Sequence, residues 1–252
     1  MKRTILITGA TAGIGEATAR RFAEDGWTVI ATGRRAERLR ALKNDLESAH
    51  QTRIIPLAFD ISDRDATEAA VRSLPDDVRP IDVLVNNAGL ALGREPLQDG
   101  DPDDWDTMID TNVKGLLYIS RVVAADMKAR GDGHIINLSS IAAKEVYPNG
   151  NVYCATKHAV DALTKGMRLD LLPHGVRVTA IAPGMVETEF SKVRYKGDDA
   201  TADQVYDGFT PLTGSDVADM IHFAATRPKH VCINDLLVMA TDQGNAVTVR
   251  RS

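Results

Sequence analysis

The chain has 252 residues, 44% of them hydrophobic and 26% charged, a composition typical of a globular protein with one large α/β domain. Its formal net charge of −5 and its pI near 5.7 argue against a nucleic-acid partner, because neutralising phosphates requires a basic face. The apolar run at residues 5–7 is too short for a secretion signal or a membrane span, so we expect a cytoplasmic protein with no membrane partner.

Short β-branched runs alternate along the chain with longer segments of helical periodicity, which is the pattern of βα units around a parallel sheet. The predicted strands cover residues 4–8, 28–32, 53–59, 82–86, 134–139, 177–182 and 231–239. The predicted helices cover residues 13–25, 36–48, 64–73, 103–130, 152–172 and 215–226. These elements predict a single α/β domain over residues 1–252. Residues 184–214 lack clear periodicity, and a loop of that length in a compact domain is usually functional or disordered.

A glycine-rich turn, Thr8-Gly9-Ala10-Thr11-Ala12-Gly13-Ile14-Gly15, connects the first predicted strand to an amphipathic helix. Glycines let the backbone approach a pyrophosphate, and a helix N-terminus offers unpaired N–H groups to the phosphates. The spacing is G-x-x-x-G-x-G rather than G-x-G-x-x-G, so the prediction depends on the position between a strand and a helix. In that context the turn predicts a nucleotide-binding loop.

The end of the second predicted strand indicates which nucleotide is bound. A carboxylate at this point would bond the ribose hydroxyls of NAD. The sequence instead has Gly33 followed by Arg34 and Arg35. Guanidinium groups hold a phosphate by paired, charged hydrogen bonds, so the arginines favour the 2′-phosphate of NADP(H). The alternative is a pair of solvated arginines at the start of a helix.

Tyr153 and Lys157 lie four residues apart on a predicted helix and therefore share one face. A free tyrosine, with a pKa of about 10, is a poor acid–base catalyst at neutral pH. An ammonium about 4 Å from the phenol, at an effective dielectric constant near 20, would lower its pKa by about 3 units. The pair therefore predicts proton transfer if both side chains share a cleft. An exposed Tyr/Lys pair is the alternative.

Two polar residues interrupt the expected pattern. Asn112 falls on the apolar stripe of the long predicted helix, where it could hold a water, bend the helix by bonding backbone groups, or be a satisfied core asparagine. Ser140 follows a strand at the carboxyl edge of the sheet, where ligands bind in open α/β folds. It could donate a hydrogen bond to a reacting oxygen, or it could cap a turn.

The loop at residues 184–214 carries Lys192, Arg194 and Lys196, which would lie on one side of an extended segment. A closing loop could use such a cation to fix a small acid, and Arg194 is the preferred ligand. A solvated face or a contact between subunits is the alternative. No metal site is expected, because Cys154 and Cys232 lack metal-binding spacing, and we expect both to be buried free thiols.

Six motifs occur in the order and approximate spacing of the short-chain dehydrogenase/reductase family, which the whole chain resembles. They are residues 8–15, residues 86–89 (Asn-Asn-Ala-Gly), Asn112, Ser140, Tyr153 with Lys157, and Pro183-Gly184. The resemblance implies a Rossmann-like, doubly wound domain with a seven-stranded parallel sheet flanked by helices. It also implies a homotetramer, or a dimer.

The resemblance further implies a role for each site residue. Tyr153 is the acid–base, Lys157 lowers its pKa and holds the nicotinamide ribose, Ser140 orients the substrate oxygen, and Asn112 holds a water linked to Lys157. Substrate contacts are expected at Ser140, Tyr153 and Arg194. Cofactor contacts are expected at Gly9, Thr11, Gly13, Ile14, Gly15, Arg34, Arg35, Asp60, Ile61, Asn87, Ala88, Gly89, Tyr153, Lys157, Pro183, Gly184, Val186 and Thr188.

Residues 31–35, 87–93, 150–153 and 189–199 are similar to a narrower group, the NADP-dependent 3-hydroxy acid dehydrogenases that oxidise serine-like substrates. Relatives of that group reduce malonic semialdehyde or sulfoacetaldehyde. We therefore expect reversible hydride transfer between NADP(H) and a small anionic hydroxy compound. The sequence does not separate a carboxylate from a sulfonate substrate, and a sulfoacetaldehyde reductase forming isethionate is the alternative. A non-catalytic NADPH-sensing regulator is the alternative from a different class.

Overall fold

The computed structural model describes residues 3–252, apart from the side chains of residues 199 and 203. Seven strands form one parallel sheet in the order β3-β2-β1-β4-β5-β6-β9. Their bounds are β1 (Thr4–Ile7), β2 (Thr28–Gly33), β3 (Ile54–Ala58), β4 (Val83–Asn86), β5 (Gly133–Leu138), β6 (Val176–Pro183) and β9 (Asp235–Val238). The seven predicted strands are all present, and the last begins at Asp235 rather than at residue 231.

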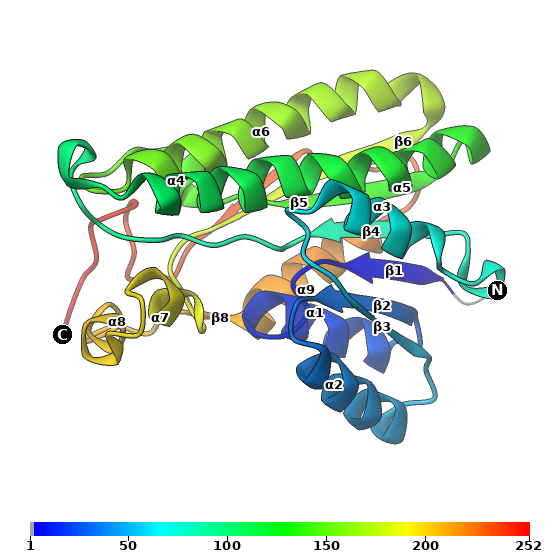
Figure 1. Ribbon diagram of the computed structural model, residues 1–252, viewed down its shortest axis with the longest axis horizontal. Coiled ribbons are helices and arrows are strands. Elements are labelled where there is room, and N and C mark those ends of the chain that lie inside the picture. Colours follow the sequence, from blue (N-terminus) through cyan, green and yellow to red (C-terminus); the bar gives the residue numbers. More distant parts are fainter. Residues whose placement is uncertain (1–2) are drawn as a thin grey trace.

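Helices cover both faces of the sheet (Figure 1). One face carries α1 (Gly13–Glu24), α2 (Ala36–Ala49) and α9 (Gly214–Ala225). The other carries α3 (Arg64–Arg72), α4 (Pro102–Ile109), α5 (Leu116–Arg130) and α6 (Asn151–Leu171). Short 3-10 turns cover Asp76–Val78, Leu97–Asp99, Ile141–Ala143 and Leu172–His174. The predicted doubly wound α/β domain is thus confirmed.

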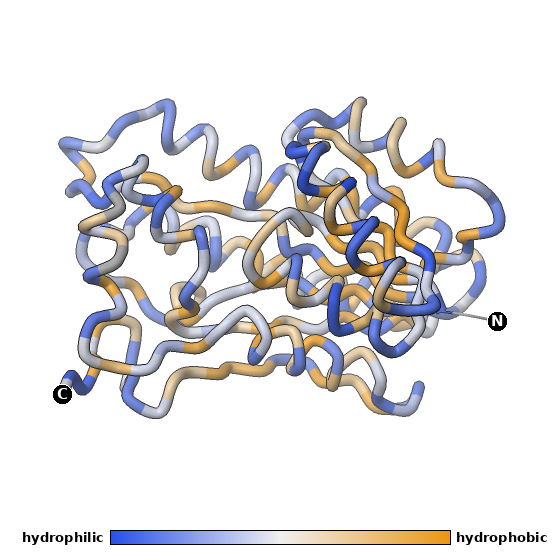
Figure 2. The backbone as a smooth tube through the Cα atoms, turned by 90° about the horizontal axis from the view of Figure 1, so that it is seen from below, coloured by the Kyte–Doolittle hydropathy of each residue, from blue (hydrophilic) through white to orange (hydrophobic). Residues whose placement is uncertain are grey.

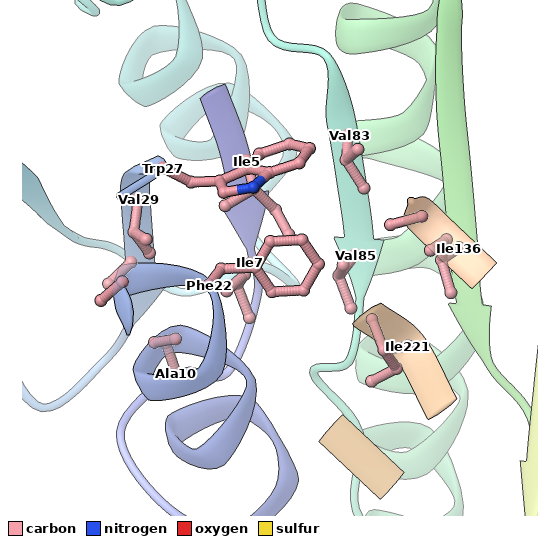
Figure 3. Packing of buried hydrophobic residues seen from close by; sticks show 14 of the residues in the cluster. Ile5, Ile7, Ala10, Phe22, Trp27, Val29, Val83, Val85, Ile136 and Ile221 are labelled. Atoms are coloured by element: carbon pink, nitrogen blue, oxygen red, sulfur yellow. The ribbon is translucent and has the colours of Figure 1, made fainter. Parts of the chain in front are cut away.

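The strands are apolar at successive residues because each face of the sheet has its own core. On the face under α1 and α9, Ile5, Ile7 and Val85 pack against Phe22 of α1 and Ile221 of α9, and all five are fully buried (Figure 3). The alternate strand residues contribute to the core under α3 and α5. Hydrophobic segments accordingly run through the middle of the molecule (Figure 2). Together the two cores fix the strand ends that carry the site.

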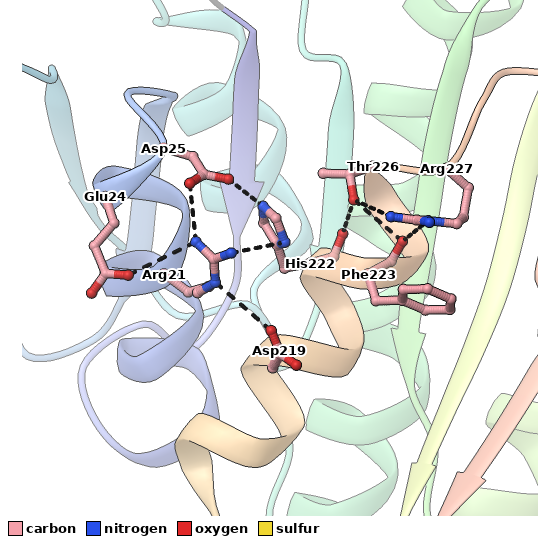
Figure 4. Close-up of polar contacts among 8 residues, drawn as sticks. All are labelled: Arg21, Glu24, Asp25, Asp219, His222, Phe223, Thr226 and Arg227. Atoms are coloured by element: carbon pink, nitrogen blue, oxygen red, sulfur yellow. Dashed lines mark hydrogen bonds and ion pairs between the residues drawn. The ribbon is translucent and has the colours of Figure 1, made fainter.

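A polar cluster joins α1 to α9 at the edge of the first core (Figure 4). The Arg21 guanidinium lies 3.1 Å from the Asp25 carboxylate, 3.8 Å from that of Asp219 and 3.3 Å from Nδ1 of His222. His222 also packs edge-on against Phe22, with ring centroids 5.1 Å apart. These contacts hold α1 against α9 and so set the position of the glycine loop at the start of α1.

The long helix predicted over residues 103–130 is interrupted, and the prediction of one continuous helix was wrong. A π-helical turn, Asp110–Gly115, separates α4 from α5. Asn112 lies within this turn and bonds the backbone of a neighbouring segment through its side chain. Such turns widen the helix by one residue and frequently occur at functional sites.

The segment between residues 184 and 214 is not an irregular loop. It contains β7 (Val186–Glu187), α7 (Phe190–Arg194), α8 (Asp199–Gln204) and β8 (Leu212–Thr213), with β7 paired to β8. These elements are too short to give a clear period in the sequence. They lie beyond the carboxyl ends of the strands, beside the site (Figure 1).

Candidate active site

A cleft runs along the carboxyl ends of the strands and brings the predicted site together. It crosses the point where β1 lies between β2 and β4, which is where the strand order reverses and ligands bind in open α/β sheets. The predicted cofactor residues that line it are Gly9, Thr11, Gly13, Ile14, Arg34, Arg35, Asp60, Ile61, Asn87, Ala88, Gly89, Tyr153, Lys157, Pro183, Gly184, Val186 and Thr188. Gly15 is the predicted cofactor residue that does not line the cleft.

The glycine loop needs its glycines for two different reasons. Gly9 and Gly13 have φ angles of +68° and +55°, which side chains other than glycine rarely adopt. Gly15 is required by close packing, because a Cβ there would lie 2.3 Å from the Gly9 carbonyl oxygen and 2.4 Å from Nδ2 of Asn87. The loop therefore presents bare backbone and the start of α1 to the cleft. This cradle fits a pyrophosphate.

At one end of the cleft, Arg35 is bonded to the glycine loop. Its Nε and Nη2 donate to Thr11 Oγ1 over 3.0 and 2.8 Å. Arg34 is more exposed and lies 3.7 Å from the Asp60 carboxylate. Arg38, which the sequence reasoning missed, reaches the same end of the cleft and approaches the Thr11 carbonyl oxygen at 3.5 Å. Arg38 follows Arg35 by three residues at the start of α2, and this spacing could have indicated that both side chains lie on the same face of the helix.

At the other end, Tyr153, Lys157 and Ser140 meet. Lys157 and Ser140 are only 7% and 8% exposed, and Tyr153 is partly buried in the cleft wall. Lys157 Nζ donates to the Leu138 carbonyl oxygen over 2.9 Å. Ser140 caps the turn after β5, accepting from the Ala142 N–H over 3.1 Å, and its hydroxyl also bonds Tyr153. The turn-cap interpretation of Ser140 is therefore confirmed, and its hydrogen bond to a reacting oxygen stays a prediction.

The pKa of Tyr153 differs from the sequence-based expectation. Burial raises the pKa of the Tyr153 hydroxyl well above its ordinary value, and Tyr147 adds to the rise, whereas the Ser140 hydrogen bond and Arg194 oppose it. The predicted lowering by Lys157 does not govern this pKa, because the Lys157 ammonium is directed to Leu138 and lies 5.9 Å from the centre of the Tyr153 ring. Desolvation of the phenol outweighs the charge.

Burial also lowers the pKa of Lys157 from 10.5 to about 8. Since the folded pKa lies below the unfolded one, the unfolded chain binds one more proton between these pH values. The free energy of unfolding should therefore rise with pH across this window, by about 3 kcal/mol from this residue. We expect Lys157→Met to remove that rise and to be more stable than the wild type at pH 7, as measured by urea unfolding.

Lys165→Met is the matched control, because Lys165 lies on the same helix with its side chain 64% exposed. It should keep the wild-type dependence on pH. Identical stability profiles for the wild type and Lys157→Met would contradict a desolvated ammonium at this position.

Asn112 lies beside the catalytic end and is 2% exposed. Its Oδ1 accepts from the Leu90 N–H and its Nδ2 donates to the Leu90 carbonyl oxygen, both over 2.8 Å. Nδ2 also approaches Thr156 Oγ1 at 3.1 Å. This geometry shows the bonding of backbone groups at a helix distortion, and the water held by Asn112 stays a prediction.

The three cations of the 184–214 segment have different surroundings, because the segment is helical at Phe190–Arg194 rather than extended, and the condition for placing all three on one side is not met. Lys192 and Arg194 belong to α7, whereas Lys196 follows it at a φ of +52° and lies 2.8 Å from Asp104. Arg194 Nη1 donates to the Tyr147 hydroxyl over 3.0 Å. Its guanidinium lies 5.5 Å from the ring centres of both Tyr147 and Tyr153.

Arg194 Nη2 is one of the few buried side-chain nitrogens in the described residues that have no hydrogen-bond partner. An unpaired buried donor is costly and is usually explained by a ligand or water. Arg194 thus has an unpaired N–H donor at Nη2, and its guanidinium group lies over the Tyr153 ring. The sequence reasoning missed Tyr147, which is the residue that holds it there.

Two further expectations concern metals and cysteines. Within residues 3–252, as far as their side chains are described, no group of three or more His, Cys, Asp or Glu side chains could hold a metal ion. Cys154 is buried as predicted, but Cys232 is exposed, because it lies in the segment before β9 rather than in the sheet. In the same part of the chain, none of the helices combines the length and apolarity needed to cross a membrane.

The chain is similar over nearly its whole length to several known dehydrogenases and reductases. Serine 3-dehydrogenase of Agrobacterium fabrum is 50% identical over 246 residues, which cover 98% of this chain and 97% of that protein. NADP-dependent 3-hydroxy acid dehydrogenase of Salmonella typhimurium is 50% identical over 250 residues, covering 98% and 99%. Sulfoacetaldehyde reductase 2 of Chromohalobacter salexigens is 47% identical over 244 residues, covering 96% of each.

A solved structure of serine dehydrogenase, in its closed form and complexed with NADP+, matches with a TM-score of 0.92 at 48% identity. The match covers 99% of this chain and 100% of that one. A family model for short chain dehydrogenases matches residues 3–199. The predicted resemblance is therefore confirmed, and the chain belongs to the short-chain dehydrogenase family.

Proposed function

We propose that the protein is an NADP(H)-dependent oxidoreductase that interconverts a small anionic hydroxy compound and its aldehyde or ketone. The observation that carries the proposal is one cleft with a pyrophosphate cradle and arginines at one end and Tyr153, Lys157 and Ser140 at the other. The family and the NADP-dependent relatives support the same reaction class.

The residues fit the cofactor, because the glycine cradle has no room for side chains and Arg35 is already positioned at its edge. Gly9 to Gly15 would hold the pyrophosphate, Arg34 and Arg35 the 2′-phosphate, and Asp60 and Ile61 the adenine. The other lining residues predicted above would hold the nicotinamide half. A bound nicotinamide supplies or accepts the hydride.

The chain's own residues handle the proton and the substrate oxygen. Tyr153 gives its hydroxyl proton to that oxygen during reduction and takes one during oxidation. Ser140, already bonded to Tyr153, stabilises the charge that develops on the oxygen. Lys157 carries its own proton at pH 7, because its pKa of about 8 lies above that pH. We infer that it holds the nicotinamide ribose and, with a water near Asn112, resupplies Tyr153.

Arg194 is the proposed ligand of the substrate's acidic group. Its unpaired Nη2 can donate to one oxygen of a carboxylate or sulfonate while Nη1 remains on Tyr147. The position over the Tyr153 ring would place the substrate between the acidic-group ligand and the proton donor. A three-carbon hydroxy acid such as serine or 3-hydroxypropionate is the proposed substrate class. Sulfoacetaldehyde reduction is the alternative, supported by the relative of that name.

A regulator that binds NADPH without chemistry is the alternative from a different class. The complete set of Asn112, Ser140, Tyr153 and Lys157 argues against it, since binding alone requires no proton donor. The test is NADPH oxidation with a broad carbonyl panel alongside NADPH binding by fluorescence. Turnover of an acidic aldehyde supports the enzyme, whereas tight NADPH binding without turnover of any carbonyl supports the regulator.

We further propose a homotetramer, with a dimer as the alternative, located in the cytoplasm. The family resemblance supports this assembly, as do exposed leucines on helices of one face, at Leu117, Leu169 and Leu172. Light scattering of the purified protein would distinguish these assemblies, and a monomer mass would contradict both.

A further inference from the structure

Glu189 joins the substrate side of the site to the phosphate end of the cofactor cleft. Its carboxylate accepts from Arg35 Nη1 over 2.9 Å and from Arg38 Nη1 over 2.7 Å. The hydrogen bonds that Arg35 and Arg38 donate hold the pKa of Glu189 below its usual value, and the bond from Arg35 has the larger effect. Glu189 lines the cleft, and both arginines also contact Thr11 of the glycine loop. The Glu189 carboxylate therefore occupies donors of Arg35 and Arg38, the two guanidinium groups beside the glycine loop, with a negative charge from the protein itself.

A 2′-phosphate at the proposed position would take its hydrogen bonds from the same guanidinium groups that now bind Glu189. The phosphate carries about two negative charges and three acceptor oxygens, whereas the carboxylate carries one charge. All three side chains are 44–48% exposed, so the ion pairs with Glu189 are weak enough for a phosphate to displace them. A nucleotide without a 2′-phosphate has no comparable group with which to compete.

Glu189 immediately precedes α7, and Arg194 ends it. The C-terminal end of this five-residue helix is tied to the substrate side, where the Gly93 N–H donates to the Arg194 carbonyl oxygen over 3.1 Å and the Arg194 side chain bonds Tyr147. The residue before this short helix thus contacts Arg35 and Arg38, and the helix itself packs against Tyr153 through Phe190 and Arg194. Release of the first contact would allow the second to move.

We propose that Glu189 determines nucleotide discrimination and couples it to the substrate site, by competing with the 2′-phosphate for Arg35 and Arg38 and so releasing α7 when that phosphate binds. This inference rests on the proposed position of the 2′-phosphate beside Arg34 and Arg35, and it adds Arg38 to that set because Arg38 shares Thr11 and Glu189 with Arg35. It goes beyond the proposed function by assigning to the cofactor site a carboxylate that competes with the 2′-phosphate, and by linking that competition to the helix that carries Arg194.

The test uses two probes that differ only in the 2′-phosphate, adenosine 2′,5′-bisphosphate and adenosine 5′-phosphate, with calorimetric titration of the full-length protein. Removing the competing charge in Glu189→Gln should tighten the bisphosphate by about 3- to 10-fold and leave the monophosphate within about twofold. Glu187→Gln is the matched control, because Glu187 is an exposed carboxylate two residues earlier on β7. It should leave both affinities within about twofold of the wild type.

Hydrogen exchange of residues 190–197 gives the second measurement. In the wild type the bisphosphate should accelerate exchange in α7 and the monophosphate should not, whereas Glu189→Gln should exchange rapidly without either probe. An unchanged or weakened bisphosphate affinity in Glu189→Gln overturns the proposal, as does exchange in α7 that does not respond to the bisphosphate in the wild type.

Arg35→Ala separates this inference from the proposed function. It should remove the preference for the bisphosphate while retaining the monophosphate, whose binding also reports a folded cleft. A retained preference would mean that the 2′-phosphate is bound elsewhere, and the proposed cofactor site would fail. A lost preference in Arg35→Ala together with no gain in Glu189→Gln would overturn the role of Glu189 alone.

Discussion

Replacing Tyr153 by Phe is expected to reduce turnover by about three orders of magnitude and to leave NADPH affinity within about twofold. The substitution removes the hydroxyl that bonds Ser140 and supplies the proton. It preserves the ring, which packs against Phe190 with centroids 5.6 Å apart and lines the cofactor cleft. Steady-state rates and fluorescence titration of NADPH measure the two effects separately.

Tyr118→Phe provides the control for this substitution. Tyr118 lies on α5, outside the catalytic end of the cleft, so its loss of a hydroxyl should change turnover by less than about twofold. If Tyr153→Phe kept more than about a tenth of wild-type turnover, another group would have to supply the proton.

Replacing Arg194 by Met should lower kcat/KM for anionic substrates by about 100-fold and should change kcat/KM for an uncharged aldehyde of equal size by less than about threefold. Methionine keeps most of the apolar contact with Tyr147 and Tyr153 but removes the donors. A hydrogen bond to a charged group contributes about 1.5–3 kcal/mol, which corresponds to about 10- to 150-fold. Parallel kinetics on the two substrate types give the measurement.

Lys192→Met is the matched control, since Lys192 lies on the same helix and is exposed. We expect Lys192→Met to keep nearly the wild-type ratio of kcat/KM for anionic substrates to kcat/KM for uncharged ones. Equal losses on charged and uncharged substrates in Arg194→Met would indicate that Arg194 serves only to position Tyr153.

The sheet could be predicted because its strands are short β-branched runs separated by helical periods. The interruption at Asn112 could not, since it depends on bonds between Asn112 and Leu90, two residues in different elements. The same limit applies to Glu189, whose partners at the start of α2 are about 150 residues away in the sequence. Sequence spacing predicts what shares a helix face, and it does not predict contacts between distant elements.

The pair Tyr153/Lys157 illustrates the same limit for electrostatics. The four-residue spacing places both side chains at one site, and the structure brings them to the same cleft. Spacing alone does not give the burial of the phenol, which outweighs the effect of the ammonium on the pKa of Tyr153. A short helix such as α7 was missed for a simpler reason, because five residues span little more than one helical turn.

The most direct test of an NADP(H)-dependent enzyme for small anionic substrates is a comparison of kcat/KM for NADPH oxidation by malonic semialdehyde, sulfoacetaldehyde and propanal. Propanal matches the chain length of malonic semialdehyde without its charge. We expect at least one acidic aldehyde to exceed propanal by about 100-fold, in line with one charged hydrogen bond from Arg194. Comparable values for propanal and both acidic aldehydes would contradict the account.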